Sequence, residues 1–345
     1  MEKLLSVVIP VYEVEPYIRQ CLESLLVPKE QLPLLDIVVV NDGTKDDSAR
    51  IAREFETAYP GVFHVIDQEN RGHGGAWNHG TELAVGKYLC YLDSDDWFDT
   101  VDFSLLLGVL QGVDVDLVLM NRTNCIVKAG REETVTMKNM VPGIVYDANL
   151  YDWLHSGNGS NITYAHNTVY RRTMMQRYLP LFCEKVMYDD VILQVMPIMA
   201  AENFLFTPLN VYRYRSGRPG QSYDPAVRKV RAGDVTTVVK HLLGFVKEHR
   251  DEVPEGSTRK AWVEAYYSLF CSWHYRELVF FPYASSRKRM KDWDTFVRDT
   301  CPDADGGWEA RLYRLLPYPL FYGCLKLEGF LSRGWRALKK MFLVY

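Results

Sequence analysis

The chain has 345 residues, of which 48% are hydrophobic and 24% are charged, a composition typical of a globular protein with a substantial core. Its aromatic share of 13% excludes disorder as the main state, because chains that cannot bury apolar surface contain few aromatic residues. Lys and Arg number 40 against 44 Asp and Glu, and the resulting net charge of −4 argues against a general nucleic-acid-binding protein, which needs an excess of cations.

The seven cysteines indicate a reducing compartment. They are an odd number, contain no Cys-x-x-Cys pair and have no histidine at the spacing of a zinc site. The apolar run 4–11 is too short for a secretory signal, and no stretch approaches the ~18 uncharged apolar residues of a membrane span. We therefore expect a cytoplasmic protein.

The first 120 residues alternate between two hydrophobic periodicities. Short apolar runs rich in β-branched residues are typical of strands buried on both faces, and apolar residues three and four apart predict helices. Strands are expected at 6–11, 37–40, 62–67, 88–92 and 116–120. Helices are expected at 17–26, 46–59, 75–85 and 103–110. This alternation predicts an α/β fold, with a mainly parallel sheet covered by helices on both faces.

The second half of the chain changes character. Residues 121–225 are mixed and turn-rich, and their pattern assigns no elements. Helices are then expected at 227–249, 260–278 and 293–300. The Gly-, Pro- and Ser-containing stretch 216–225 is the best boundary, so we expect one domain over residues 1–222 and a helical region over residues 223–345.

The C-terminal end is basic although the chain as a whole is acidic. Residues 311–345 carry seven Lys and Arg against Glu328 alone, a charge of +6, which leaves −10 for the other residues. Apolar residues recur there three and four apart, namely Leu327, Phe330, Leu331, Trp335, Leu338, Met341 and Phe342. This predicts a basic amphipathic helix that lies on an anionic membrane surface, on the inner face of the cell membrane. The alternatives are a terminal helix packed on its own domain and a dimer contact.

Acidic residues follow the predicted strands at the edge where ligands of open parallel sheets bind. Three of them, Asp93, Asp95 and Asp96, lie within four residues, and carboxylates so close are stable when a divalent cation or hydrogen-bond donors compensate them. Their oxygen ligands suit Mg²⁺ or Mn²⁺. The alternative is a solvated acidic turn.

Together, these motifs resemble the inverting glycosyltransferases of family 2, whose nucleotide-sugar-binding fold is called GT-A. The resemblance covers residues 4–222, through the segments 6–12 and 40–48, the pattern Asn-x-Gly-x-x-x-Ala-x-Asn-x-Gly at 70–80, and the Asp-x-Asp motif at 93–95. It implies that Asp95 binds the metal. The nucleotide-sugar-binding residues that it implies are Pro10, Val11, Tyr12, Glu13, Asp42, Asn70, Gly72, Asn78, Asp93 and Ser94. Among them, Asp42 is implied to contact the nucleobase, and Asp93 to lie near the ribose and diphosphate.

Asp189 and Asp190 resemble the Glu-Asp motif of the same family, in which the second acid is the catalytic base. Asp190 is therefore the candidate base, because an acceptor hydroxyl becomes a good nucleophile when a carboxylate accepts its proton. The alternative is an N-terminal cap of a helix over residues 191–199. The family often has arginine where this chain has Trp77, and Arg71 or Lys87 is a candidate substitute.

Two further segments have weaker assignments. Residues 212–222 form a basic stretch with three arginines, which resembles the mobile segment that closes over the diphosphate in this family. A solvated linker is the alternative. Trp153, His155 and residues 164–167 line the acceptor site in one interpretation and are structural in the other.

The resemblance implies a metal-dependent inverting glycosyltransferase with a nucleotide-sugar donor, with UDP as the expected nucleotide. The implied acceptor is a hydroxyl of a glycan or lipid-linked molecule in cell-surface polysaccharide synthesis. Two alternatives stay open. A sugar-nucleotide nucleotidyltransferase needs a Gly-rich basic loop where this chain has Tyr12 and Glu13. A non-catalytic nucleotide-sugar-binding or scaffold protein is compatible with the departures at Trp77 and Asp189.

Overall fold

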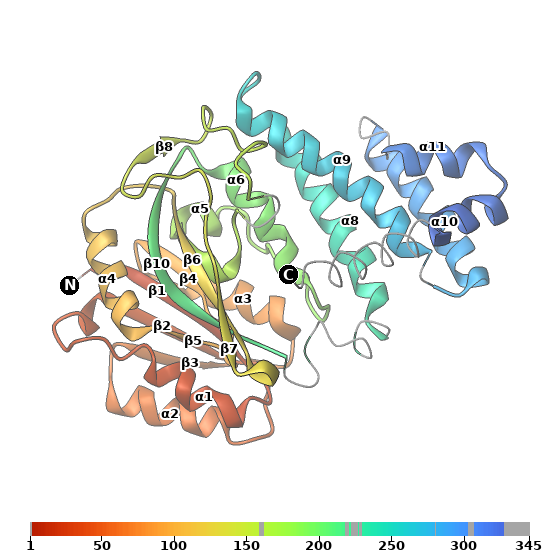
Figure 1. Cartoon of the computed structure of the whole chain (residues 1–345). Coiled ribbons are helices and arrows are strands. Elements are labelled where there is room, and N and C mark those ends of the chain that lie inside the picture. Colours follow the sequence, from red (N-terminus) through yellow and green to blue (C-terminus); the bar gives the residue numbers. More distant parts are fainter. Residues whose placement is uncertain are drawn as a thin grey trace. The chain divides into compact units, whose positions relative to one another are not determined.

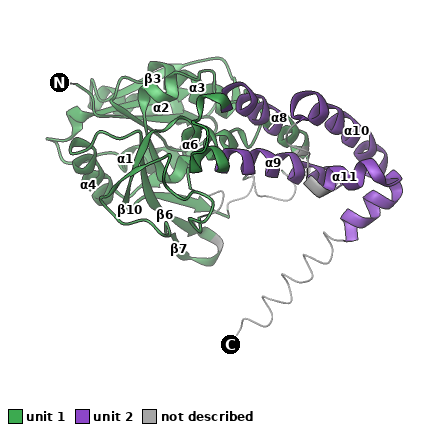
Figure 2. Cartoon of the chain, turned by 90° about the horizontal axis from the view of Figure 1, so that it is seen from above, with its two compact units in different colours: residues 1–238, 251–261 green, residues 239–250, 262–345 purple. Residues whose placement is uncertain are grey.

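The structure is a computed structural model that describes residues 2–158, 162–217, 221, 227, 230–279, 281–302 and 307–327. The chain forms two compact units, residues 1–238 with 251–261 and residues 239–250 with 262–345 (Figure 2). The predicted boundary between residues 222 and 223 falls in a stretch of which most residues lie outside the described part of the chain.

One mixed sheet forms the centre of the first unit, with the strand order β3-β2-β1-β4-β9-β6-β10-β5 (Figure 1). β1, β2, β3 and β4 are parallel, β9 runs antiparallel between β4 and β6, and β10 is parallel to β6. β7 pairs with β6 and β8 with β10. The strands are β1 Leu5–Val11, β2 Leu35–Asn41, β3 Phe63–Asp67, β4 Tyr88–Tyr91, β5 Trp97–Phe98, β6 Leu117–Ile126, β7 Arg131–Val135, β8 Val145–Asp147, β9 Thr168–Arg171 and β10 Asn203–Ser216.

Helices cover both faces of the parallel strands, as predicted. Val7 and Ile9 of β1 join the core that contains Ile18, Phe55 and Phe103 from the helices α1, α2 and α4. On the other face α3 packs on β1 so closely that a Cβ at Gly80 would lie 2.3 Å from Cγ1 of Val8. The helices of this unit are α1 Glu15–Glu23, α2 Ser48–Ala58, α3 Gly72–Leu83, α4 Thr100–Gln111, α5 Arg172–Gln176 and α6 Met196–Ala200. Short 3₁₀ helices lie at Leu32–Leu34, Val127–Ala129, Ala165–Asn167 and Asp189–Gln194.

The predicted α/β fold is confirmed, and two local predictions need correction. The helix predicted at 75–85 begins at Gly72, which makes the Gly-rich residues its first turn. The basic stretch predicted as a loop at 212–222 is strand β10 as far as Ser216, because it pairs with β6 along Arg122–Ile126. Residues 218–220 and 222 of that stretch lie outside the described residues.

Helices dominate the rest of the chain, as the periodicity predicted. They are α8 Ala232–His249, the 3₁₀ helix Arg250–Glu252, α9 Thr258–Leu278, α10 Tyr283–Thr300 and α11 Gly307–Leu315. In the second unit, Trp293 is buried against His274 with ring centroids 4.4 Å apart. Within the described residues, no helix combines the length and the apolar character needed to cross a membrane. The predicted amphipathic helix falls almost entirely in residues 328–345, which lie outside the described residues.

Two carboxylates are buried among the described residues of the second unit, and each has an arginine partner. Asp294 accepts hydrogen bonds from Arg314 Nε at 2.9 Å and from the Tyr275 hydroxyl at 2.7 Å, and it forms an ion pair with Arg298, whose Nε is 2.8 Å from Oδ2. Glu309, which is fully buried, pairs with Arg276 and accepts a hydrogen bond from Ser272. Burying a carboxylate is expensive unless it is paired, so these arginines make a structural role possible for both acids.

Candidate active site

The carboxyl ends of β1 and β2 are fastened to each other. The amide of Asp42 donates to the carbonyl oxygen of Val11 at 2.9 Å, and the amide of Glu13 donates to Oγ1 of Thr44 at 2.8 Å. Pro10 and Val11 are buried within β1, whereas Tyr12 and Glu13 beyond its end are exposed. Of the four residues predicted here to bind the nucleotide sugar, only the latter two therefore have side chains exposed to solvent.

Asp42 is 2% exposed and holds the start of α3. Its Oδ1 accepts hydrogen bonds from Gln68 Nε2 and from the Arg71 amide, both at 2.7 Å, and its Oδ2 accepts one from the Gly72 amide at 2.9 Å. Asn70 donates from Nδ2 to the Asp42 carbonyl oxygen at 3.0 Å. A carboxylate at the first turn of a helix is favourable. If Asp42 contacts a nucleobase, it does so with a carboxylate that already accepts hydrogen bonds from the protein.

Gly72 and Asn78 connect α3 to the segment that leads to the predicted base. A Cβ at Gly72, whose φ is +77°, would lie 2.7 Å from the amide nitrogen of Lys185. Asn78 is buried, accepts from the amides of Leu181 and Phe182 at 2.9 Å, and donates to the carbonyl of Phe182 at 2.8 Å. The side chain of Asn78 is thus placed to position this segment rather than to face a ligand.

Asp93, directly beyond β4, lies between two histidines. Its Oδ1 is 3.0 Å from Nε2 of His73, and its Oδ2 is 3.5 Å from Nε2 of His166. Its amide donates to the hydroxyl of Tyr212 at 3.1 Å. Although burial alone would raise it, hydrogen bonds with His166 and His73 hold the pKa of Asp93 well below its usual value. Asp93 is therefore an anion held in one orientation.

Asp96 is 1% exposed and has quite different partners. Its Oδ2 accepts from the hydroxyl of Tyr212 at 2.8 Å, and its Oδ1 accepts from the amide of Arg215 at 2.6 Å. Burial, followed by the charges of Asp95 and Asp93, raises the pKa of Asp96 well above its usual value. A bound cation would relieve this repulsion among like charges.

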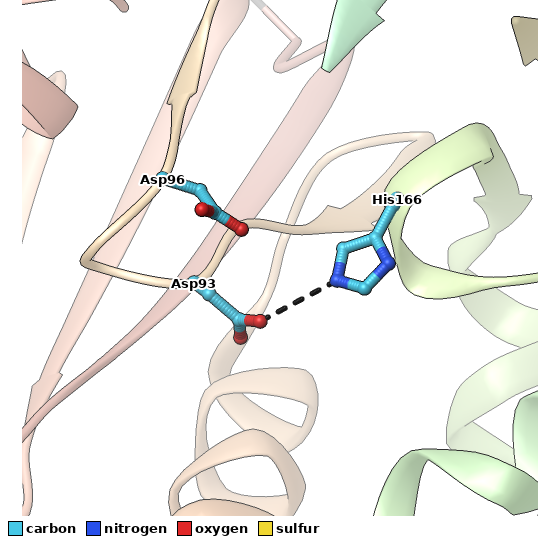
Figure 3. A group of neighbouring side chains, drawn as sticks. All are labelled: Asp93, Asp96 and His166. Carbon is cyan, nitrogen blue, oxygen red and sulfur yellow. Dashed lines mark hydrogen bonds and ion pairs between the residues drawn. The ribbon is translucent and has the colours of Figure 1, made fainter. Parts of the chain in front are cut away.

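Asp93, Asp96 and His166 each offer a ligand atom, and these atoms lie within 4.8 Å of one another (Figure 3). Two carboxylate oxygens and one imidazole nitrogen form a donor set that suits Mn²⁺. Asp95, the predicted metal ligand, is half-buried on the same loop, and its carbonyl oxygen accepts from Arg215 Nε at 2.8 Å. Ser94 between these acids is buried. The residues present on this loop fit a divalent cation.

His166 is enclosed by aromatic rings. The centroid of its ring lies 4.7 Å from that of Tyr212, 4.9 Å from that of Tyr214 and 5.3 Å from that of Tyr164. His166 belongs to the segment 164–167, for which an acceptor-site and a structural interpretation stand side by side. The structure places His166 next to Asp93. Trp153 of the same interpretation is buried, with Nε1 bonded to the carbonyl of Ala148.

The predicted base motif reaches the same place from the far half of the domain. Asp189 is 4% exposed, and its Oδ2 is 3.0 Å from Nδ1 of His73. Asp190 follows in the same 3₁₀ helix, where burial and then the charge of Asp189 raise the pKa of Asp190 to about 6. A carboxyl with this pKa is ionised at neutral pH and is a stronger base than an ordinary aspartate.

The family often has an arginine where this chain has Trp77. Neither Arg71 nor Lys87, the two suggested substitutes, has a side-chain ion pair with Asp93, Asp189 or Asp190. Arg71 pairs with Glu184, and Lys87 precedes β4, where its Nζ is 3.2 Å from Asp114, whereas Asp93 follows that strand. Trp77 itself is buried. The positive group found at the acids is a histidine of α3. Sequence reasoning missed it, although it lies inside the Gly-rich motif and sits one helical turn before Trp77.

Comparisons with known proteins agree with the motifs. The model of glycosyl transferase family 2 matches residues 6–179, which is half of the chain. The chain belongs to glycosyl transferase family 2. The match runs from the start of β1 past β9, so it includes the Asp93–Asp96 loop and ends before Asp190.

Curated relatives match about three fifths of this family 2 protein. The putative glycosyltransferase EpsH of Bacillus subtilis is 30% identical over 214 residues, which are 61% of this chain and 60% of that protein. The uncharacterized glycosyltransferase YibD of Escherichia coli is 28% identical over 215 residues, again 61% of this chain and 60% of that protein. The chain thus matches about 60% of the length of these two curated relatives.

A solved structure has the same fold. Residues 1–349 of Staphylococcus aureus TarS, crystallised with UDP-GlcNAc, superimpose with a TM-score of 0.53 at 17% sequence identity. The superposition covers 90% of this chain and 92% of the TarS chain. At this level of identity, the likeness shows that the two chains share a fold.

Proposed function

We propose that this protein is an inverting, metal-dependent glycosyltransferase that moves a sugar from a nucleotide sugar to an acceptor hydroxyl. The observation that carries the proposal is the convergence of Asp93, Asp96, His166 and Asp189 at one edge of the sheet, beside Asp190. Asp93, Asp189 and Asp190 belong to segments that resemble the family's Asp-x-Asp and Glu-Asp motifs, and Asp96 lies next to the first. Family membership supports the same reaction class.

The proposed donor lies across the carboxyl ends of β1, β2 and β4, with UDP as the expected nucleotide. Tyr12 and Glu13 are exposed there, and Asp42 is fixed at the start of α3. Crystals of the TarS fragment with UDP-GlcNAc and with UDP support a uridine nucleotide for this fold. Sequence similarity to chondroitin synthase of Escherichia coli, 35% over 121 residues, supports an acceptor in cell-surface polysaccharide synthesis.

The metal proposed is Mn²⁺ or Mg²⁺ on the loop 93–96. Asp95 is the ligand that the motif implies, and Asp93, Asp96 and His166 are the neighbouring group whose ligand atoms converge. When bound, such a cation stabilises the negative charge of the leaving diphosphate. The chain's own contribution is to hold Asp93 ionised and oriented between two histidines.

Asp190 is the proposed catalytic base. It accepts the proton of the acceptor hydroxyl while that oxygen bonds to the anomeric carbon and the bond from that carbon to the diphosphate breaks. The attack comes from the face opposite the diphosphate, so the anomeric configuration inverts and the enzyme forms no covalent intermediate. The raised pKa of Asp190, about 6, supports this assignment.

A donor screen tests the proposal. The full chain is incubated with a panel of UDP-, GDP- and dTDP-sugars, with Mn²⁺, Mg²⁺ or EDTA, and with or without a bacterial lipid extract. We expect release of UDP that EDTA abolishes and that the acceptor-containing extract increases. NMR of the product then reports its anomeric configuration. Nucleotide binding without any nucleotide release would favour the scaffold alternative, and release of pyrophosphate from a nucleoside triphosphate would favour a nucleotidyltransferase.

The peripheral membrane location is also part of the proposal. It rests on the seven cations and the apolar spacing of residues 311–345, since each basic residue near an anionic surface contributes about 1 kcal/mol. Deletion of residues 325–345 is expected to move the protein from the membrane fraction to the soluble fraction. Equal distribution of the full and truncated chains would contradict the membrane assignment and leave the transfer reaction unaffected.

A further inference from the structure

His73 lies between two carboxylates that come from distant parts of the chain. Its Nε2 is 3.0 Å from Oδ1 of Asp93, which follows β4, and its Nδ1 is 3.0 Å from Oδ2 of Asp189. Asp189 is 116 residues away in sequence and belongs to the base motif. A single imidazole thus joins the loop proposed for the metal and nucleotide to the segment proposed for the base.

These two contacts depend on the protonation state of the imidazole ring. A neutral imidazole has one N–H donor, so its second nitrogen would turn a lone pair toward a carboxylate oxygen. Both contacts are hydrogen bonds only when both nitrogens carry a proton. Because each nitrogen lies 3.0 Å from a carboxylate oxygen, the doubly protonated ring is the form that makes both hydrogen bonds.

The position of the ring is set by its surroundings. His73 is in the first turn of α3, and its ring lies over that of Trp77, with centroids 4.1 Å apart. The next residue, Gly74, lets the base segment approach, since a Cβ there would lie 2.2 Å from the carbonyl oxygen of Cys183 and 2.7 Å from Oδ2 of Asp189. A side chain at position 74 would therefore separate His73 from Asp189.

We propose that His73 is a positioning residue that holds the base motif in register with the Asp93 loop through simultaneous hydrogen bonds to Asp189 and Asp93. It acts on the reaction through Asp190, the neighbour of Asp189, rather than by contact with the reacting atoms. The inference rests on the proposed function, because it concerns the geometry of that same site. A loop that carries the donor and a loop that carries the base have to be aligned for in-line attack.

The proposal has a consequence for Asp190 that can be measured. The groups that act on Asp190 are Asp189 and Asp93, which disfavour its ionisation, and His73 and His166, which favour it, with Tyr170 as a further neighbour. Loss of the His73 cation leaves the charge of Asp189 unbalanced, so the acid limb of the kcat–pH profile moves to higher pH. Loss of the Asp189 charge moves it to lower pH.

The experiment compares kcat–pH profiles of the full chain and four variants, with the best donor of the screen and saturating Mn²⁺. His73→Ala is expected to move the acid limb up by about one pH unit, and Asp189→Asn to move it down by a similar amount, the usual effect of one nearby charge. His73→Lys keeps a cation without two aligned donors, so its limb is expected near that of the wild type. At high pH the kcat of His73→Lys, like that of His73→Ala, is expected to stay about tenfold below that of the wild type, because the Asp93 loop and the base motif are no longer aligned.

His64→Ala is the matched control, since His64 also faces an aspartate, Asp36, at 3.7 Å on the edge of the sheet. Its profile is expected to match that of the wild type. Asp189→Asn preserves size and shape, so it decides the matter if His73→Ala does not fold. An unmoved limb in Asp189→Asn, together with an unmoved limb in His73→Ala if that variant folds, would overturn the inference alone. Absence of turnover by the wild type would overturn the proposed function and this inference with it.

Discussion

The two units of the chain bury carboxylates in different ways. In the helical unit, Asp294 and Glu309 pair with arginines, whose charge is permanent. At the sheet edge, Asp93 and Asp189 meet the imidazole of His73, and Asp96 meets a phenol hydroxyl and a backbone amide. In the helical unit, arginines neutralise the charges of the acids. At the sheet edge, several negatively charged carboxylates remain close to one another.

This difference separates acids that stabilise a fold from acids that are available for chemistry. An arginine partner lowers the free energy of the ionised carboxylate in the folded protein. Phenol, amide and imidazole partners orient the carboxylates at the site, while burial, followed by repulsion between like charges, raises the pKa of Asp96 and of Asp190. A cation or a substrate proton can then supply the missing compensation.

The sharpest test of the comparison is Asp190→Asn. Because an amide cannot accept the proton of the acceptor hydroxyl, we expect kcat to fall between about 10²- and 10⁴-fold, with UDP affinity unchanged. UDP release and isothermal titration calorimetry measure the two quantities. Asp251→Asn, which changes an acid with an 89% exposed side chain, serves as the control. Turnover retained by Asp190→Asn would show that another group is the base.

On the other side of the comparison, Glu309→Ala is expected to destabilise the helical unit by about 1 to 3 kcal/mol, because it removes the buried carboxylate that accepts hydrogen bonds from Arg276 and Ser272. Urea unfolding followed by circular dichroism measures the change. Glu264→Ala, at an exposed position of α9, is the control and is expected to unfold as the wild type does. If both variants unfold at the same urea concentration, the arginine-paired acid is not stabilising.

The pH dependence of turnover tests the raised pKa of Asp190. Below a pKa of about 6 the carboxyl is protonated and cannot act as a base, so kcat rises with pH through this value. We expect a loss of about tenfold for each pH unit below it. Initial rates in overlapping buffers, with melting curves at each pH, distinguish titration from unfolding. A limb near the usual aspartate value would mean that Asp190 is more solvated than this structure indicates.

The smallest expected effect is that of Asp96→Asn on stability. The pKa of Asp96 is raised in the folded state, so ionisation of Asp96 destabilises the fold as pH rises through that value. The amide removes this loss, and we expect Asp96→Asn to be slightly more stable than the wild type at neutral pH, with a difference that disappears in acid. Thermal melts at two pH values measure it. A loss of stability at neutral pH, like that of Glu309→Ala, would place Asp96 with the structural acids.

Much of the site follows from local patterns. The Asp93–Asp96 loop and the Asp189–Asp190 pair were found from residue type and from their place beside apolar runs or family motifs. The strands and helices before residue 120 also follow from periodicity, because a doubly buried strand has no polar face. Asn78 is an informative exception. Its motif predicts a ligand contact, but the side chain is bonded to the backbone of Leu181 and Phe182.

By itself, the sequence determined the α/β alternation, the carboxylate-rich loops at the strand ends and the helical second half. Only the tertiary structure decided which groups meet those carboxylates. The partners of His73 are 20 and 116 residues away, and they reach it because β9 inserts antiparallel beside β4 and the base segment packs on α3. A hydrogen bond needs two atoms about 3 Å apart, and the path of the chain between them sets that distance. This distance cannot be inferred from the spacing of the residues in the sequence.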